Sequence, residues 1–163
     1  MVKKIELDFP DFITHVPQSK NKWLKIGYNK IYASAHYTVR HSFVAAMHKY
    51  LEKHIPDNLS IDGPVTTELT VYVPINYGNV KRLKDKKTGK YYINWKPARD
   101  DYEPTWDIGN LAMVWLKCID DMLVKKGLFP DDNVKYLRGS SYEFREVATL
   151  RERKLVYKVK TIE

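Results

Sequence analysis

The stretch Val65-Thr-Thr-Glu-Leu-Thr-Val-Tyr-Val-Pro74 carries the clearest structural signal in the chain. Its β-branched and aromatic residues pack well on a pleated surface, so the stretch predicts a β-strand. The flanking sequence must then supply the helices and strands that cover this strand.

Helical periodicity lies on both sides of the strand. Residues 39–54 place apolar side chains three and four positions apart, which predicts a helix that ends before Pro56. Residues 108–126 repeat this spacing after Asp107, a residue type that favours the N-cap position. Gly127 stands where a glycine commonly ends a helix. Two main helices are therefore expected.

The first part of the chain carries weaker strand signals. Residues 4–16 mix apolar and acidic side chains around Pro10, which predicts a broken or edge strand. Residues 23–26 and 31–33 flank a short polar connection at Gly27–Lys30. This arrangement predicts a short hairpin that turns at the connection.

The rest of the chain predicts a long polar loop and two more strands. Residues 75–103 form a basic insertion loop, with a small hairpin expected to turn at Lys87-Thr-Gly89. Residues 134–138 predict a strand that ends in a turn at Gly139-Ser-Ser141. Residues 155–160 alternate apolar and polar side chains and predict a half-exposed strand.

The element order β-β-α-β-α-β-β predicts an α/β (α+β) fold. We expect residues 1–163 to form one small domain, with a mixed sheet of about four to five strands packed on two main helices. A chain of this size buries enough surface to build a core without disulfides or zinc.

The charge, the cysteine count and the lack of long apolar runs limit the classes of function that the chain can have. The chain has 163 residues, with 28 Lys and Arg against 20 Asp and Glu, which gives a net charge of +8. Excess basic charge attracts polyanions, of which nucleic acid is the commonest, although a basic protein without such a partner is the alternative. The single cysteine, Cys118, excludes an internal disulfide framework. No apolar run reaches membrane-spanning length, and we expect a cytoplasmic protein.

Carboxylates gather around the second predicted helix. Asp107 precedes it, Asp120-Asp121 lie within it and Asp131-Asp132 follow it. Such oxygen ligands suit Mg²⁺ or Mn²⁺. Asp107 and Asp121 would stand about 21 Å apart along the helix axis, too far to share an ion. The loop at 128–131 could bring the acidic pair part of the way back toward Asp107, or a second subunit could supply one half of a site.

Three runs of residues together resemble the RusA-type Holliday junction resolvases of phages and prophages. These runs are Trp106-Asp-Ile-Gly-Asn-Leu111, Asp121-Met-Leu123 and Gly127-Leu-Phe-Pro-Asp-Asp-Asn-Val134. The family's pattern is Asp-x-Asp-Asn-Leu, a helix with a Lys and an Asp-x-Leu, then a Gly and an Asp-Asp pair. Pro17-Gln-Ser-Lys-Asn21 also resembles the family's Pro-x-Ser-x-Asn element.

The resemblance implies a homodimeric endonuclease that uses Mg²⁺ or Mn²⁺ to resolve branched, four-way DNA junctions during DNA recombination and repair. It implies metal ligands at Asp107 and at Asp132 or its neighbour Asp131. The alternative is a purely structural role for these residues, with Asp107 as a helix N-cap and Asp131-Asp132 as a polar turn.

The sequence departs from the family's pattern at three points. Gly109 stands where the second aspartate of Asp-x-Asp-Asn is expected, and Met113 stands at the place of the helix lysine. Lys117, one turn later, could serve instead, as the residue that neutralises charge on the scissile phosphate. The interval from Asn110 to Asp121 is about one helical turn longer than in the family. A DNA-binding module that has lost catalysis is therefore the alternative function.

Further residues receive supporting roles. Asn110 is expected either to orient Asp107 or to support the start of the helix, and Asp121 to have a structural or supporting role rather than to bind the metal directly. Trp115 and Met122 are expected in the core or in a dimer seam. The expected contacts to the DNA backbone come from basic side chains. These are Lys20, Lys22, Lys81, Arg82, Lys84, Lys86 and Lys87. An RNA-binding or host-interaction protein is a third reading, which rests on charge and on Tyr and Trp content.

Overall fold

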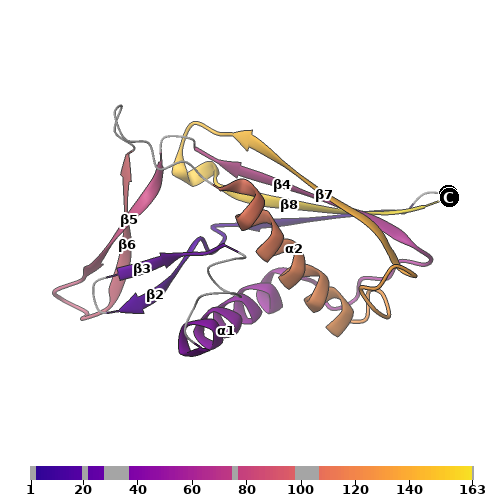
Figure 1. Cartoon of the computed structure of the whole chain (residues 1–163), viewed down its shortest axis with the longest axis horizontal. Coiled ribbons are helices and arrows are strands. Elements are labelled where there is room, and N and C mark those ends of the chain that lie inside the picture. Colours follow the sequence, from indigo (N-terminus) through magenta and orange to yellow (C-terminus); the bar gives the residue numbers. More distant parts are fainter. Residues whose placement is uncertain (1–2, 20–21, 28–36, 75–76, 98–106, 163) are drawn as a thin grey trace.

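The computed structural model describes residues 3–19, 22–27, 37–74, 77–97 and 107–162 (Figure 1). Both predicted main helices are present, with bounds within two residues of those expected. The described elements are β1 (Lys4–Pro10), β2 (His15–Ser19), β3 (Lys22–Lys25), α1 (Tyr37–His54), β4 (Val65–Val73), β5 (Tyr77–Lys84), β6 (Tyr91–Pro97), α2 (Ile108–Lys125), β7 (Leu137–Glu146), the short 3₁₀ helix η2 (Leu150–Glu152) and β8 (Lys154–Thr161).

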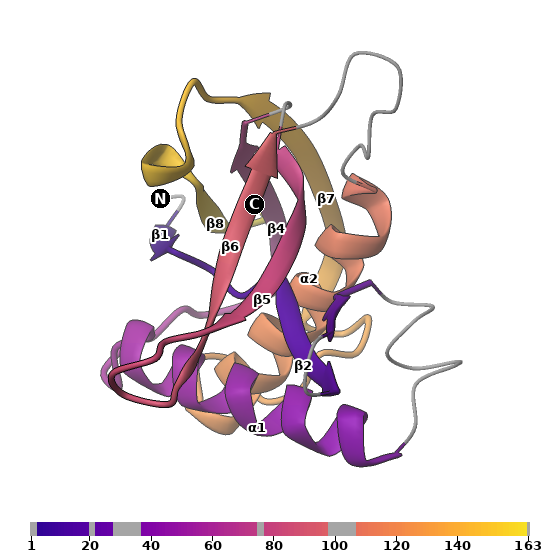
Figure 2. The ribbon, with the colours of Figure 1, turned by 90° about the vertical axis from the view of Figure 1, so that its left-hand side faces the viewer.

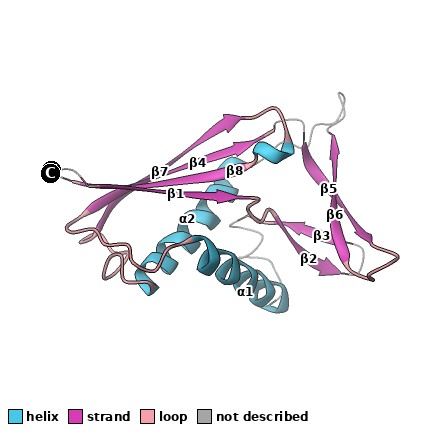
Figure 3. Cartoon of the chain, turned by 180° about the vertical axis from the view of Figure 1, so that it is seen from behind, coloured by secondary structure: helices cyan, strands magenta, loops and turns pink. Residues whose placement is uncertain are grey.

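A four-stranded mixed sheet forms the centre of the domain, in the order β1-β8-β4-β7. β8 pairs antiparallel with β1 and β4, whereas β7 runs parallel to β4. The helices α1 and α2 lie on the same side of this sheet, as Figures 1 and 3 show from opposite directions. The predicted fold, a small α+β domain with a mixed sheet on two helices, is confirmed.

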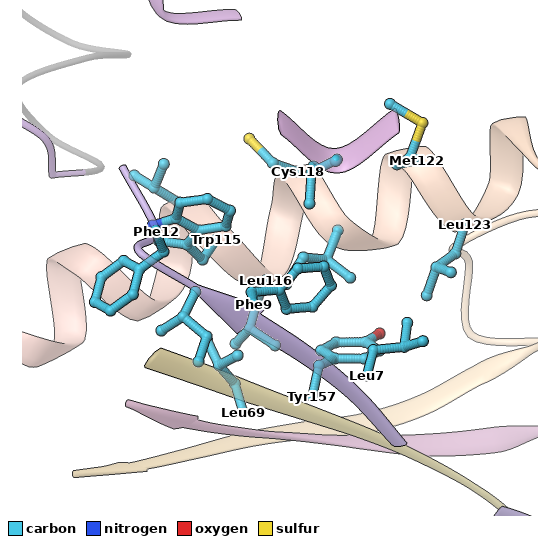
Figure 4. Close-up of a cluster of buried hydrophobic side chains, with 14 of the residues drawn as sticks. Leu7, Phe9, Phe12, Leu69, Trp115, Leu116, Cys118, Met122, Leu123 and Tyr157 are labelled. Carbon is cyan, nitrogen blue, oxygen red and sulfur yellow. The ribbon is translucent and has the colours of Figure 1, made fainter. Parts of the chain in front are cut away.

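The core lies between α2 and the sheet. Trp115 and Met122 are 0% and 1% exposed and belong to the hydrophobic core. The Trp115 ring packs edge-on against Phe12, whereas Met122 projects from the side of α2 that faces away from the strands (Figure 4). The Trp115 indole Nε1 also donates a hydrogen bond to the Ile13 carbonyl at 3.2 Å. Both side chains are core residues, so the alternative of a dimer seam formed by them is wrong. Cys118 is buried on the same helix.

The predicted turn at Gly139-Ser-Ser141 is wrong, because these residues run through the middle of β7. Their partner strand explains the difference. Gly139 pairs with Thr66 and Ser140 with Thr67, and the Ser140 and Thr67 hydroxyls hydrogen-bond at 2.8 Å. Cross-strand pairing of this kind outweighs the local turn preference of Gly and Ser.

Two small antiparallel hairpins complete the fold. The hairpin predicted around Lys87–Gly89 is confirmed: β5 and β6 pair with each other, and Gly89 takes the positive φ of +71° that its turn requires. The strand predicted at 23–26 is present as β3, which pairs with β2. The partner strand predicted at 31–33 lies outside the described residues. The turn predicted at Gly27–Lys30 lies almost wholly outside the described residues. No helix in the described ranges is both long and apolar enough to cross a membrane.

Candidate functional site

Asp107 caps the N-terminus of α2 with an ordered carboxylate. Its Oδ1 accepts a hydrogen bond from the Asn110 backbone N–H at 3.2 Å, and its Oδ2 accepts one from the Asn110 side-chain amide at 2.6 Å. The residue as a whole is exposed. Asn110 therefore orients the carboxylate while leaving it open to solvent, so the cap and the candidate ligand are the same group.

Tyr142 of β7 joins this cluster at Gly109. A Cβ atom on Gly109 would stand 3.1 Å from the Tyr142 Oη and 3.8 Å from Asp107 Oδ1. The place that the resemblance assigns to a second aspartate is thus occupied from the side by a tyrosine hydroxyl. Sequence reasoning missed Tyr142, because a predicted turn at 139–141 hid the strand that carries it.

A second polar cluster lies thirteen residues further along α2, at Asp120. This carboxyl is only 6% exposed and accepts a hydrogen bond from the Tyr157 hydroxyl of β8. Burial raises the pKa of Asp120 to about 7, and the negative charges of Asp132 and Asp121 add to the rise. The Tyr157 hydrogen bond and the Lys117 charge oppose the shift. At neutral pH Asp120 is therefore only partly ionised.

The Asp120 cluster extends across the sheet as a chain of hydroxyl groups. The Tyr157 hydroxyl is also hydrogen-bonded to Thr67, whose own hydroxyl contacts Ser140 at 2.8 Å. Burial and the neighbouring Asp120 raise the Tyr157 pKa well above its usual value. These groups link α2 to β8, β4 and β7 within the core. The signal available in the sequence was Asp120 itself, a carboxylate on the apolar stripe of a helix.

Lys117 stands with this second cluster. Its Nζ lies 3.6 Å from Asp121 Oδ2 in an exposed i,i+4 ion pair. Ten residues separate it from Asp107, or about 15 Å along the helix axis. Within one chain, Lys117 therefore cannot act on a phosphate held at Asp107. Asp121 likewise pairs with Lys117 and does not support Asp107.

Asp131 and Asp132 form an exposed turn after α2. Asp131 accepts hydrogen bonds from the Asp132 backbone N–H at 2.8 Å and from the Asn133 side-chain amide at 2.6 Å. The negative charge of Asp132 helps to raise the pKa of Asp120, so this turn lies nearer the Asp120 end of α2 than the Asp107 end. The loop does not return this pair to Asp107. Across the described ranges, no three His, Cys, Asp or Glu residues form a group that could hold a metal ion.

The predicted DNA-binding lysines are only partly described. Lys84, Lys86 and Lys87 are exposed at the turn of the β5–β6 hairpin, which lies at one end of the molecule (Figure 1). Asp85 orders this turn by accepting a hydrogen bond from the Lys87 backbone N–H at 2.7 Å. The remaining candidates lie on strands whose side chains are not described, or outside the described residues. These are Lys81 and Arg82 on β5, Lys22 on β3, and Lys20.

Comparison with known proteins adds no family to these observations. No protein-family model matches the chain, and no curated protein matches its sequence. Arguments about function therefore depend on the residues themselves.

Proposed function

We propose that the protein binds branched DNA and cuts it as a metal-dependent, homodimeric endonuclease of the RusA kind. The observation that carries the proposal is the Asp107 carboxylate, which is exposed and oriented by Asn110 at the start of α2. The sequence resemblance implies a metal ligand at this position.

Charge supports DNA as the substrate. The chain carries a net charge of +8, and Lys84, Lys86 and Lys87 present three ammonium groups on one exposed turn. Lysines on a projecting hairpin can follow a phosphate backbone without reading its sequence. This suits an enzyme that recognises the shape of a junction.

Asp107 supplies only part of the protein ligands that a divalent ion usually has. Mg²⁺ commonly takes one or two protein carboxylates and fills its other positions with water and substrate phosphates. Asp107 supplies one carboxylate, and among the described residues no group of three or more His, Cys, Asp or Glu surrounds it. We therefore assign to one chain a weak site that DNA phosphates help to fill. A bound ion there would supply an activated water for phosphodiester hydrolysis.

Gly109 favours a second candidate function, a DNA-binding module without catalysis. Glycine offers no ligand, and the Tyr142 hydroxyl stands 3.1 Å from where its Cβ would be. A protein of this kind would bind junctions through the same basic surface and leave the phosphodiester intact.

One experiment separates the two functions. Junction binding is measured by fluorescence anisotropy in EDTA, with a linear duplex and an RNA hairpin at the same salt concentration. Cleavage of the same junction is then followed on a denaturing gel with Mg²⁺, with Mn²⁺ and with EDTA. The endonuclease proposal predicts preferential junction binding and symmetric nicks that need the metal. Binding without nicks would establish the module, and equal binding to all three nucleic acids would contradict both.

A further inference from the structure

Two aromatic rings are exposed on the same face of β7. Tyr142 is 47% exposed and Phe144 is 37% exposed. Their partners on β4 are Leu69 and Val71, which are both fully buried in the core. Because side chains alternate between the faces of a sheet and residues in register share a face, both rings lie on the helix side of the sheet. They lie at its edge, where solvent reaches them.

The Tyr142 ring lies beside the candidate ligand Asp107. The Tyr142 Oη and the Asp107 Oδ1 stand 3.1 Å and 3.8 Å from one point, the place that a Cβ atom on Gly109 would take. Figure 2 shows α2 alongside β7. Met113, one turn beyond Gly109 on the same side of α2, is 48% exposed. An exposed aromatic and apolar surface therefore borders the carboxylate that we propose as a metal ligand.

The spacing of the two rings suits a DNA strand whose bases are unstacked. Residues two positions apart on a β-strand are separated by about 6.8 Å. Nucleotides along one strand of a duplex are separated by about 3.4 Å. A base that stacks on Tyr142 and a neighbouring base that stacks on Phe144 therefore cannot also stack on each other. Aromatic side chains bind unpaired bases in this way with little regard to base identity.

We propose that Tyr142 and Phe144 form a platform on which two consecutive unpaired bases of a DNA strand stack, so that the adjoining phosphate lies beside Asp107. This inference rests on the proposed function and specifies its substrate as branched DNA with unpaired nucleotides next to the branch point. In a fully paired junction the two bases would first have to leave their stack, at a free-energy cost that unpaired nucleotides do not carry.

Other occupants fit this surface less well. Among the described residues its apolar part consists of three side chains, whereas a stable protein interface buries about 800 Å² on each partner. Duplex DNA presents phosphates and base edges but hides the faces of its bases. The net charge of +8 favours a polyanion as partner. Glu146 is exposed two positions after Phe144 on the same face, where it would repel a further phosphate and limit the platform to two bases.

A photochemical cross-link tests the contact in the unaltered protein. A short oligothymidine strand carries one 5-iodouracil, a base that forms a covalent bond on irradiation with an aromatic ring stacked against it. Trypsin digestion and mass spectrometry then locate the bond. We expect it in the peptide Gly139–Arg145, which contains both rings. A cross-link found only in other peptides would overturn the proposal.

Binding by variants gives a second, quantitative test. The affinities for the oligothymidine strand and for a linear duplex are measured by fluorescence anisotropy in EDTA. Tyr142→Leu and Phe144→Leu each keep an apolar side chain and remove the ring. Each is expected to weaken single-strand binding about tenfold and to leave duplex binding nearly unchanged. Tyr142→Phe keeps the ring and is expected to bind the single strand as the wild type does.

Tyr72→Leu is the matched control. Tyr72 is next to Val71 on β4 and so lies on the opposite face of the sheet, where Lys154 Nζ stands 5.3 Å from its ring centroid. This variant is expected to change neither affinity. Unchanged single-strand binding in both leucine variants of the platform would overturn the proposal, as would an equal loss of duplex binding.

The outcome for cleavage is separate from the outcome for the platform. A protein that cross-links through the two rings, and loses single-strand binding without them, but never cuts branched DNA would refute the proposed function and leave the platform standing. Metal-dependent cleavage by a protein whose leucine variants bind the single strand as tightly as the wild type would overturn the platform and leave the proposed function standing.

Discussion

At the scale of single residues, the buried Asp120 carboxyl predicts how the free energy of unfolding depends on pH. Its folded-state pKa of about 7 lies above the value of about 3.9 expected in an unfolded chain. The folded protein therefore binds more protons than the unfolded one between these values, so the free energy of unfolding falls as pH rises from about 4 to about 7. Asp120→Asn removes this loss and keeps an oxygen that accepts the Tyr157 hydrogen bond.

We expect Asp120→Asn to be more stable than the wild type at pH 8, by roughly 2–4 kcal/mol. Near pH 4 the two proteins should have similar stability. Urea denaturation at both pH values measures the difference, with the exposed Asp121→Asn as control. A variant whose stability follows the same pH profile as the wild type would show that Asp120 titrates normally.

A second prediction at the scale of single residues concerns Gly109 and the affinity of the candidate site for a metal ion. Asp in place of Gly109 would add the missing carboxylate, but its Cβ would press on the Tyr142 Oη at 3.1 Å. We expect Gly109→Asp combined with Tyr142→Phe, which removes that oxygen, to bind Mn²⁺ about tenfold more tightly than the wild type. Electron paramagnetic resonance titration reports free Mn²⁺ directly. Gly109→Asn with the same Tyr142→Phe change controls for volume, and equal affinity in both double variants would contradict the site.

At the scale of elements, the sequence predicted the helices well and β7 poorly. The repeat in α2 and its caps, Asp107 and Gly127, are local signals, and the helix begins and ends where they indicate. The course of β7 depends on its parallel pairing with β4, a strand more than sixty residues away. Local reasoning therefore found a turn at Gly139–Ser141 and could not find Tyr142.

The prediction at the scale of elements concerns DNA binding by the β5–β6 hairpin. If its turn contacts DNA, Lys84→Ala with Lys87→Ala should flatten the plot of log binding constant against log salt by roughly 0.9 for each lost phosphate contact. Lys3→Ala with Lys125→Ala is the matched control, since both lysines are exposed and pair with Asp62 and Glu52 at 3.4 Å. An unchanged slope would show that the hairpin points away from DNA.

At the scale of the whole molecule, the sequence predicted the residues of the candidate site but not the distance between them. The resemblance implied ligand roles for Asp107 and Asp132 and a supporting role for Asn110, and the Asp107–Asn110 contact forms within one turn of helix. The distance from Asp107 to Asp132 depends on the direction that the chain takes after α2. The structure turns it toward Asp120 rather than back to Asp107.

We expect the Asp107 carboxylate to serve cleavage rather than folding or DNA binding. Asp107→Asn tests it most directly, because asparagine also caps helices well and removes the charge at nearly constant side-chain size. Cleavage and binding of a four-way junction are measured for this variant beside Asp62→Asn, an exposed aspartate paired with Lys3. We predict that Asp107→Asn lowers the Mg²⁺-dependent cleavage rate at least a hundredfold with unchanged junction affinity, and that Asp62→Asn alters neither. Equal loss of binding and cleavage, or full cleavage by Asp107→Asn, would contradict the claim.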